Sequence, residues 1–154
     1  MNFQRADTED IPQLVDMRVA YIKCDQGEVT ESDLAAMQTK LPEYFQKHLN
    51  KDLIAFVAKD NGRIAATAFL LVVEKPSNPH FINGKVGEVL NVYTSDEYRH
   101  KGLATALMND LIAYAAENNL DHVDLSATED GYPLYKKLGF KDSASSYMEM
   151  RYQF

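Results

Sequence analysis

Two β-forming segments on either side of a tight-turn signal constrain the fold of this chain more than any other feature. Residues 53–58 and 63–73 are rich in apolar and β-branched side chains, and Asp60-Asn61-Gly62 lies between them. Asn and Gly readily adopt the left-handed backbone conformation that the central residues of a two-residue hairpin need. The two segments are therefore expected to pair as antiparallel strands.

A later part of the chain requires the opposite kind of connection. Residues 102–117 show an apolar helical face and lie between two predicted strands, at 87–94 and 122–126. Such a strand–helix–strand unit predicts a right-handed crossover with parallel strands. A hairpin and a crossover in one chain predict a central mixed β-sheet flanked by helices, in the α/β (α+β) class.

Apolar periodicity and turn residues predict the remaining elements. They are a strand at 2–6, helices at 7–24, 30–49 and 132–138, a loop at 74–86, and a last strand at 140–152. Pro42 is expected to split or kink its helix, because proline lacks the N–H that a helix interior uses.

Length and composition limit the possible functions. With 154 residues, 45% of them hydrophobic, the chain is expected to form one folded domain over 1–154. Cys24 is the only cysteine, the first residues are polar and acidic, and no apolar run is of membrane length, so we expect a cytoplasmic protein with no membrane partner. The net charge of −7 disfavours nucleic acid and fits either a cationic partner or simple solubility.

The segment Arg99-His100-Lys101-Gly102-Leu103-Ala104 lies between a predicted strand and the helix at 102–117. The first turn of a helix has N–H groups without intrahelical partners, at the positive end of the helix dipole. Gly102 lets a ligand approach the backbone, and Arg99 and Lys101 add positive charge. The segment predicts an anion site, although it matches neither the phosphate-loop nor the dinucleotide-binding pattern.

Two motifs connect this site to a family. Residues 92–108, which include the segment above, resemble the acyl-CoA-binding motif of the GNAT superfamily of N-acetyltransferases, Arg/Gln-x-x-Gly-x-Gly/Ala. Leu134-Tyr135-Lys136-Lys137-Leu138-Gly139-Phe140 resembles the family's Leu-Tyr-x-x-x-Gly-Phe. The resemblance is close over residues 87–140 and looser before them. It implies the GNAT fold and direct transfer of an acetyl group from acetyl-CoA to a primary amine.

The resemblance also implies which groups bind acetyl-CoA. The strands at 87–94 and 122–126 would splay apart, and main-chain groups of Val92 and Thr94 would bind the pantetheine arm in the opening. Backbone N–H groups beside Arg99 would bind the pyrophosphate; they belong to Lys101, Gly102, Leu103, Ala104 and Thr105. Thr128 replaces an asparagine that contacts the CoA arm in many relatives, and offers a smaller hydrogen-bonding group.

Three groups would carry the chemistry by the same resemblance. The N–H of Val92 would stabilise the oxyanion, and Tyr135, unless it is only a core aromatic, would protonate the leaving thiolate. Glu88 precedes Arg99 at the offset of a general-base glutamate in the histone-type branch of the family. A carboxylate works best as a base when burial raises its pKa. A surface carboxylate, or ordered water in place of a base, are the alternatives for Glu88.

Other candidates have a structural interpretation beside the functional one. Asn91 and Tyr93 lie on the strand face opposite Val92, and Tyr147 and Glu149 lie on the last strand. Each of these two sets either borders the acceptor pocket or consists of packing and surface residues. Arg18 interrupts an apolar helix face, and is either a snorkelling side chain or an arginine aimed into a site. The four histidines lack metal-ligand spacing, so no metal is expected.

The sequence thus predicts a GNAT-type N-acetyltransferase. Its acceptor, a small-molecule amine or a lysine or N-terminal amine, is not identified by any motif. A non-catalytic acyl-CoA sensor of the same fold and an acyltransferase for longer acyl groups are the alternatives, and a homodimer stays open.

Overall fold

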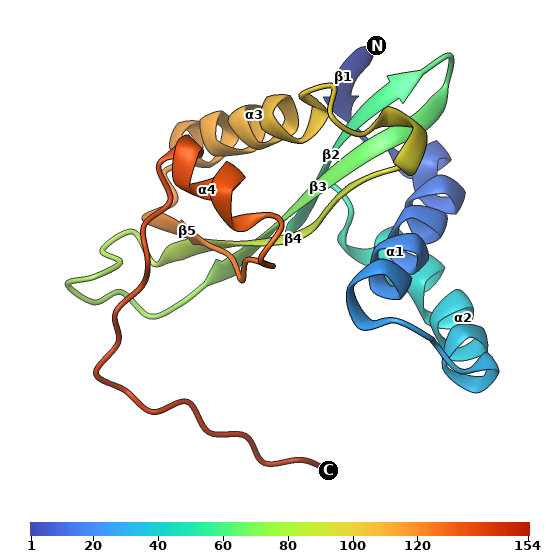
Figure 1. Cartoon of the computed structure of the whole chain (residues 1–154). Helices are drawn as coiled ribbons and strands as arrows, with labels where there is room; N and C mark the ends of the chain where they lie inside the picture. The colour runs from blue at the N-terminus through green and yellow to red at the C-terminus, as the bar shows by residue number, and fades with distance from the viewer.

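A five-stranded mixed sheet runs through the centre of the protein, of which a computed structural model describes residues 1–154 (Figure 1). In order across the sheet, the strands are β1 (Asn2–Arg5), β2 (Leu53–Asp60), β3 (Arg63–Glu74), β4 (Lys85–Thr94) and β5 (His122–Asp124). Neighbours from β1 to β4 are antiparallel, whereas β4 and β5 are parallel. The predicted mixed sheet is confirmed.

The hairpin between β2 and β3 forms as its turn residues predict. Asp60 pairs with Arg63, and the two residues between them, Asn61 and Gly62, have φ angles of 49° and 82°. Positive φ at both central positions is typical of a type I′ turn, whose twist matches that of the paired strands. This turn sets the start of the long β2–β3 ladder.

Four helices cover the two faces of the sheet (Figure 1). On one face lie α1 (Ile11–Gln26) and α2 (Glu31–His48), and on the other lie α3 (Leu103–Glu117) and α4 (Tyr132–Leu138). Short 3₁₀ turns, η1 (Thr8–Asp10) and η2 (Asp96–Tyr98), precede α1 and α3. The expected split of α2 at Pro42 is wrong, because the loss of one hydrogen bond does not break an 18-residue helix that buries Phe45.

Each face of the sheet has its own hydrophobic core. Consecutive residues of β2 alternate between the two cores: Ile54 and Phe56 pack toward α3, whereas Ala55 and Val57 pack toward α1 and α2. Both faces of the strand are therefore buried. This burial explains why the sequence at 53–58 is an unbroken apolar run instead of an alternating one.

The strands β4 and β5 part after a short parallel ladder. Their pairing ends at Glu88 and Asp124, whereas β4 continues to Thr94. Gly87 allows close packing at this point, because a Cβ on it would lie 2.6 Å from Leu70 Cδ1. Beyond Glu88, one edge of β4 has no strand partner.

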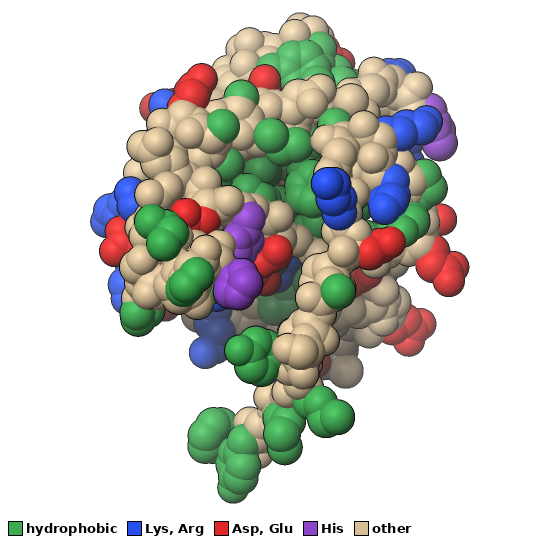
Figure 2. Space-filling model, turned by 90° about the vertical axis from the view of Figure 1, so that its left-hand side faces the viewer, with side chains coloured by type: hydrophobic (Ala, Val, Ile, Leu, Met, Phe, Trp, Pro, Cys, Tyr) green, Lys and Arg blue, Asp and Glu red, His purple; other side chains and the backbone are tan.

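The expected last strand at 140–152 is wrong. After α4 the chain leaves the body, and residues 141–154, here called the tail, run exposed to solvent (Figures 1 and 2). Alternating apolar and polar residues form a strand only where a neighbouring strand bonds their backbone, and no strand of the sheet pairs with the tail.

Candidate active site

A cavity of about 200 Å³ lies where β4 parts from β5. Its walls come from α1, β4, the segment after β5, and α4. They are formed by Arg18, Tyr21, Glu88, Val89, Leu90, Asn91, Val92, Leu125, Ser126, Thr128 and Tyr135. The fold therefore brings together six residues singled out from the sequence, namely Arg18, Glu88, Asn91, Val92, Thr128 and Tyr135.

A β-bulge in β4 shapes this cavity. The β3–β4 register shifts after Thr67, and Asn91 at the bulge has a φ of 53° and is 2% exposed. Asn91 Nδ2 donates to Thr67 Oγ1 (3.1 Å), and Thr67 Oγ1 donates to the Asn91 carbonyl (2.9 Å). Beyond the bulge, Val92 packs toward α3, and Tyr93 packs toward α1 and α2 without lining the cavity. Asn91 thus supports the shape of the strand from inside.

Tyr135 lines the cavity from α4, and its ring packs edge-on against Phe140 with 5.9 Å between ring centroids. Burial, and to a smaller extent the nearby Tyr21, raises the pKa of Tyr135 to about 12. The hydroxyl therefore stays protonated at neutral pH and can donate a proton or a hydrogen bond. Gly131 leaves room for the ring, since a Cβ there would lie 3.0 Å from Tyr135 Cε2.

Glu88 lines the same cavity from β4, at the last residue pair with β5. Its side chain is exposed and takes part in none of the chain's ion pairs. The burial that an efficient carboxylate base needs is therefore not present here. Its role as a base, direct or through water, stays a prediction.

The start of α3 presents free backbone N–H groups. Gly102, with a φ of 77°, precedes the helix, no side chain caps its first turn, and Ala106 N makes the bond to the Gly102 carbonyl (3.1 Å). The N–H groups of Leu103, Ala104 and Thr105 thus lie at the positive end of the helix without a capping side chain. This arrangement can bind an anion.

The two cations predicted near this helix start are held by local contacts. Arg99 Nη2 lies 2.9 Å from Asp96 Oδ1, and Arg99 Nε donates to the Thr94 carbonyl (3.3 Å). Lys101 Nζ donates to the Glu97 carbonyl (3.2 Å). Each side chain keeps donors that these contacts do not use, and the backbone N–H groups of α3 have no side-chain partner.

Thr128 uses its polar groups locally. Gly131 N donates to Thr128 Oγ1 (3.1 Å), and Tyr132 N donates to the Thr128 carbonyl (2.9 Å). These bonds fix the start of α4, and through it the position of Tyr135. The predicted contact of Thr128 with the CoA arm stays a prediction.

Arg18, which the sequence leaves undecided, lines the cavity from α1. Its Nη1 donates to Asn91 Oδ1 (3.3 Å), and its Cζ lies 5.7 Å from the centroid of the Tyr21 ring. Burial lowers the pKa of Arg18, while the nearby Tyr21 acts in the opposite direction. The sequence signal for Tyr21, which no motif marks, is its position three residues after Arg18, on the same helix face.

A second cavity, of about 260 Å³, adjoins the first, since Arg18 and Leu90 line both. Its other walls are apolar or aromatic. They are formed by Leu41, Tyr44, Phe45, Leu53 and Phe69. These residues come from α2, β2 and β3, so no local motif in the sequence marks them as a site.

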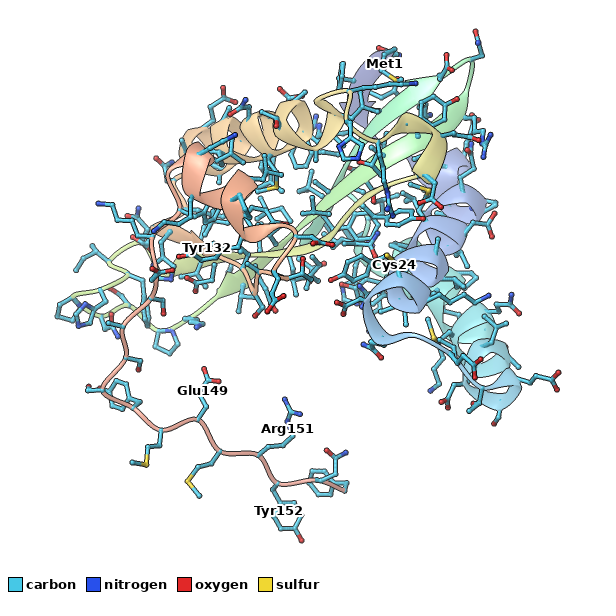
Figure 3. The ribbon with its side chains drawn as sticks, in the orientation of Figure 1. Met1, Cys24, Tyr132, Glu149, Arg151 and Tyr152 are labelled. Carbon is cyan, nitrogen blue, oxygen red and sulfur yellow. The ribbon has the colours of Figure 1, made fainter.

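Tyr147 and Glu149 line neither cavity, so the structure agrees with the surface interpretation of these residues and not with a place beside the acceptor pocket. Both lie on the tail, where Tyr147 is 85% exposed. Figure 3 shows Glu149, Arg151 and Tyr152 on the tail, away from the body of the protein. A place beside the pocket depended on a last strand that does not form.

Two further findings concern metal binding and membrane spans. No three His, Cys, Asp or Glu side chains gather in a way that would hold a metal ion. No helix combines the length and the apolar character that crossing a membrane requires.

The cavity where β4 and β5 part is lined by the half-buried Tyr135, and the start of α3 leaves backbone N–H groups without a capping side chain. The model of the acetyltransferase (GNAT) family matches residues 15–140, and the chain belongs to this family. The resemblance stated from the two motifs is confirmed.

Particular relatives share this architecture. A predicted acetyltransferase from Clostridium acetobutylicum, crystallised with acetyl-CoA, is 32% identical, with a TM-score of 0.85 over 97% of this chain and 95% of that one. A GCN5-related N-acetyltransferase from Ralstonia eutropha JMP134 is 27% identical, with a TM-score of 0.80 over 98% and 97%. Among curated proteins, the glucosamine 6-phosphate N-acetyltransferase of Trypanosoma brucei brucei is 33% identical over 88 residues, 56% of this chain and 56% of that protein. The match thus spans little more than half of that relative.

Proposed function

We propose that this protein transfers an acetyl group from acetyl-CoA directly to a primary amine. The observation that carries the proposal is the cavity at the parting of β4 and β5, which Glu88, Val92 and Tyr135 line together. The relative from Clostridium acetobutylicum supports it, because that protein was crystallised with acetyl-CoA and matches nearly the whole chain.

The groups of the chain suit the parts of acetyl-CoA. The N–H groups at the start of α3, after Gly102, suit the pyrophosphate, with Arg99 and Lys101 adding charge. The edge of β4 beyond Glu88 offers main-chain groups to the pantetheine amides, and this edge includes Val92.

The proposed reaction is a direct displacement. Glu88, directly or through water, takes a proton from the protonated amine, and the neutral nitrogen then attacks the thioester carbonyl carbon. After the attack the nitrogen gives up a second proton to water, so that the product is a neutral amide. The N–H of Val92 would donate to the carbonyl oxygen as negative charge develops. The C–S bond breaks, and Tyr135, which its raised pKa of about 12 keeps protonated, would donate a proton to the departing sulfur.

A titration with acetyl-CoA, followed by thiol release with a set of amines, tests this function. The set contains small amines, polyamines, a peptide N-terminus and glucosamine 6-phosphate. We expect saturable binding of acetyl-CoA and thiol release with at least one amine. No binding of acetyl-CoA would overturn the proposal.

Substitution of Tyr135 tests the proposed acid. Tyr135→Phe should lower kcat about 100-fold, the range of a lost general acid, while the Kd for acetyl-CoA changes by less than about twofold. Tyr132→Phe is the matched control, because this neighbour on α4 donates to Asp142 (2.8 Å) outside the cavity. An equal rate for the two variants would exclude Tyr135 as the acid.

The two alternatives give different results in the same experiments. A non-catalytic sensor would bind acetyl-CoA but release no thiol with any amine. Its affinity for acetyl-CoA would be the same in the wild type and in Tyr135→Phe. An acyltransferase for longer acyl groups would show a higher kcat/KM with longer acyl-CoA than with acetyl-CoA.

A further inference from the structure

The guanidinium of Arg18 lies at the junction of the two cavities with most of its donors unused. Arg18 Nη1 donates to Asn91 Oδ1 (3.3 Å), which occupies one of the five N–H groups that a guanidinium carries. The Arg18 side chain takes part in none of the chain's ion pairs. A partly buried cation without an anionic partner is costly to keep in a fold.

The charged and titratable groups around Arg18 leave this charge uncompensated. Tyr21 and Tyr44 both act on Arg18 through space, and burial raises the pKa of both, so both phenols are neutral at physiological pH. Asp25 acts on Arg18 through space, and Glu88 shares the first cavity with it, but neither lies within ion-pair distance. An anion from outside the chain would therefore find a free charge-assisted partner.

The second cavity adds an apolar compartment to the same place. Arg18 and Leu90 line both cavities, and the walls of the second include Phe45 and Phe69. Phe45 and Phe69 pack edge-on with 5.8 Å between ring centroids, so the compartment has an aromatic wall. An amine held near Glu88 in the first cavity can extend an apolar group into this compartment.

The geometry points to an acceptor that carries an anionic group, bound by Arg18, and an apolar group, bound in the second cavity. The anion is a carboxylate or a phosphate, since either accepts two parallel hydrogen bonds from a guanidinium. The inference rests on the proposed function, because it names the class of amine that this acetyltransferase would use. Arg18 would then determine which amines the protein accepts.

Matched pairs of amines that differ only in the anionic group test the inference. Phenylalanine against phenethylamine and leucine against isoamylamine test a carboxylate, and glucosamine 6-phosphate against glucosamine tests a phosphate without an apolar group. The phenylalanine and leucine pairs are called the apolar pairs. For the wild-type protein, kcat/KM should be about tenfold higher for the anionic member of each apolar pair, which is the difference that one buried ion pair would give. A preference confined to the sugar pair would support phosphate binding but overturn the apolar compartment.

The variant Arg18→Gln removes the charge and keeps a donor for Asn91. In this variant the kcat/KM values of the two members of each apolar pair should differ by less than about threefold, mainly because kcat/KM for the anionic member falls. Arg63→Gln is the matched control, because Arg63 is exposed and pairs with Glu97 (2.6 Å) away from both cavities. An equal loss with both members of a pair would show that Arg18 only supports the bulge, and would overturn the inference.

A second measurement uses the wild-type protein alone, so the inference stays testable if Arg18→Gln does not fold. The anion 3-phenylpropionate should compete with the amine acceptor, and its alcohol, 3-phenylpropanol, should compete about tenfold less well. Equal inhibition by the two compounds would overturn the role of Arg18. Failure of the proposed function itself has a different signature, namely no binding of acetyl-CoA and no thiol release with any amine.

Discussion

At the scale of single residues, the protonation of Tyr135 ties the candidate site to the stability of the fold. Burial raises the pKa of Tyr135 to about 12 from its ordinary 10.0, so the folded state holds this proton more tightly than the unfolded chain does. The stabilisation is fully present below pH 10 and is lost as pH rises toward 12. The free energy of unfolding, measured with urea at several pH values over this range, should therefore fall more steeply for the wild type than for Tyr135→Phe. Parallel slopes for the two proteins would contradict the assignment.

At the scale of elements, we expect the side-chain hydrogen bonds of the bulge in β4 to stabilise the fold. Asn91 combines a positive φ of 53° with a buried side chain bonded to Thr67, so Asn91→Ala should cost about 2–3 kcal/mol for the strained backbone and the unsatisfied partners together. Asn61→Ala is the matched control, since Asn61 has a similar φ of 49° in the exposed hairpin turn, and it should cost about 1 kcal/mol. Chemical denaturation measures both. Equal losses for the two variants would mean that the buried hydrogen bonds of the bulge add nothing.

The elements also show which features the sequence predicts. The hairpin and the parallel pairing of β4 and β5, with α3 between them in the chain, are predicted correctly, because turn residues and helical periodicity are local signals. The place of Tyr135 follows from a short motif on α4. Arg18 is not decided by its neighbours in sequence, because its hydrogen-bond partner, Asn91, lies 73 residues away and is positioned by a bulge that only strand pairing creates. The strand at 140–152 is predicted wrongly for the same reason, since strand formation depends on a partner that the segment itself does not specify.

At the scale of the whole molecule, the tail leaves an apolar surface open. Apolar side chains alternate along it with polar ones, and the apolar set is almost fully exposed (Figure 2). Its members are Met148 (92%), Met150 (95%), Tyr152 (83%) and Phe154 (107%). The last strand of the sheet, β5, also has an edge that no strand covers. A strand-like apolar segment and an open sheet edge both favour association between chains.

We therefore expect the wild-type protein to associate as its concentration rises, with a mass by light scattering that increases from 17.4 kDa toward twice that value. The triple variant Met148→Ser, Met150→Ser and Phe154→Ser should keep the mass of the monomer, because serine removes three of the four exposed apolar side chains that favour association. Substitution of Glu149 and Arg151 by serine changes the opposite face of the tail and should leave the association of the wild type intact. If the triple variant and the wild type had the same mass at every concentration, the tail would have no part in association.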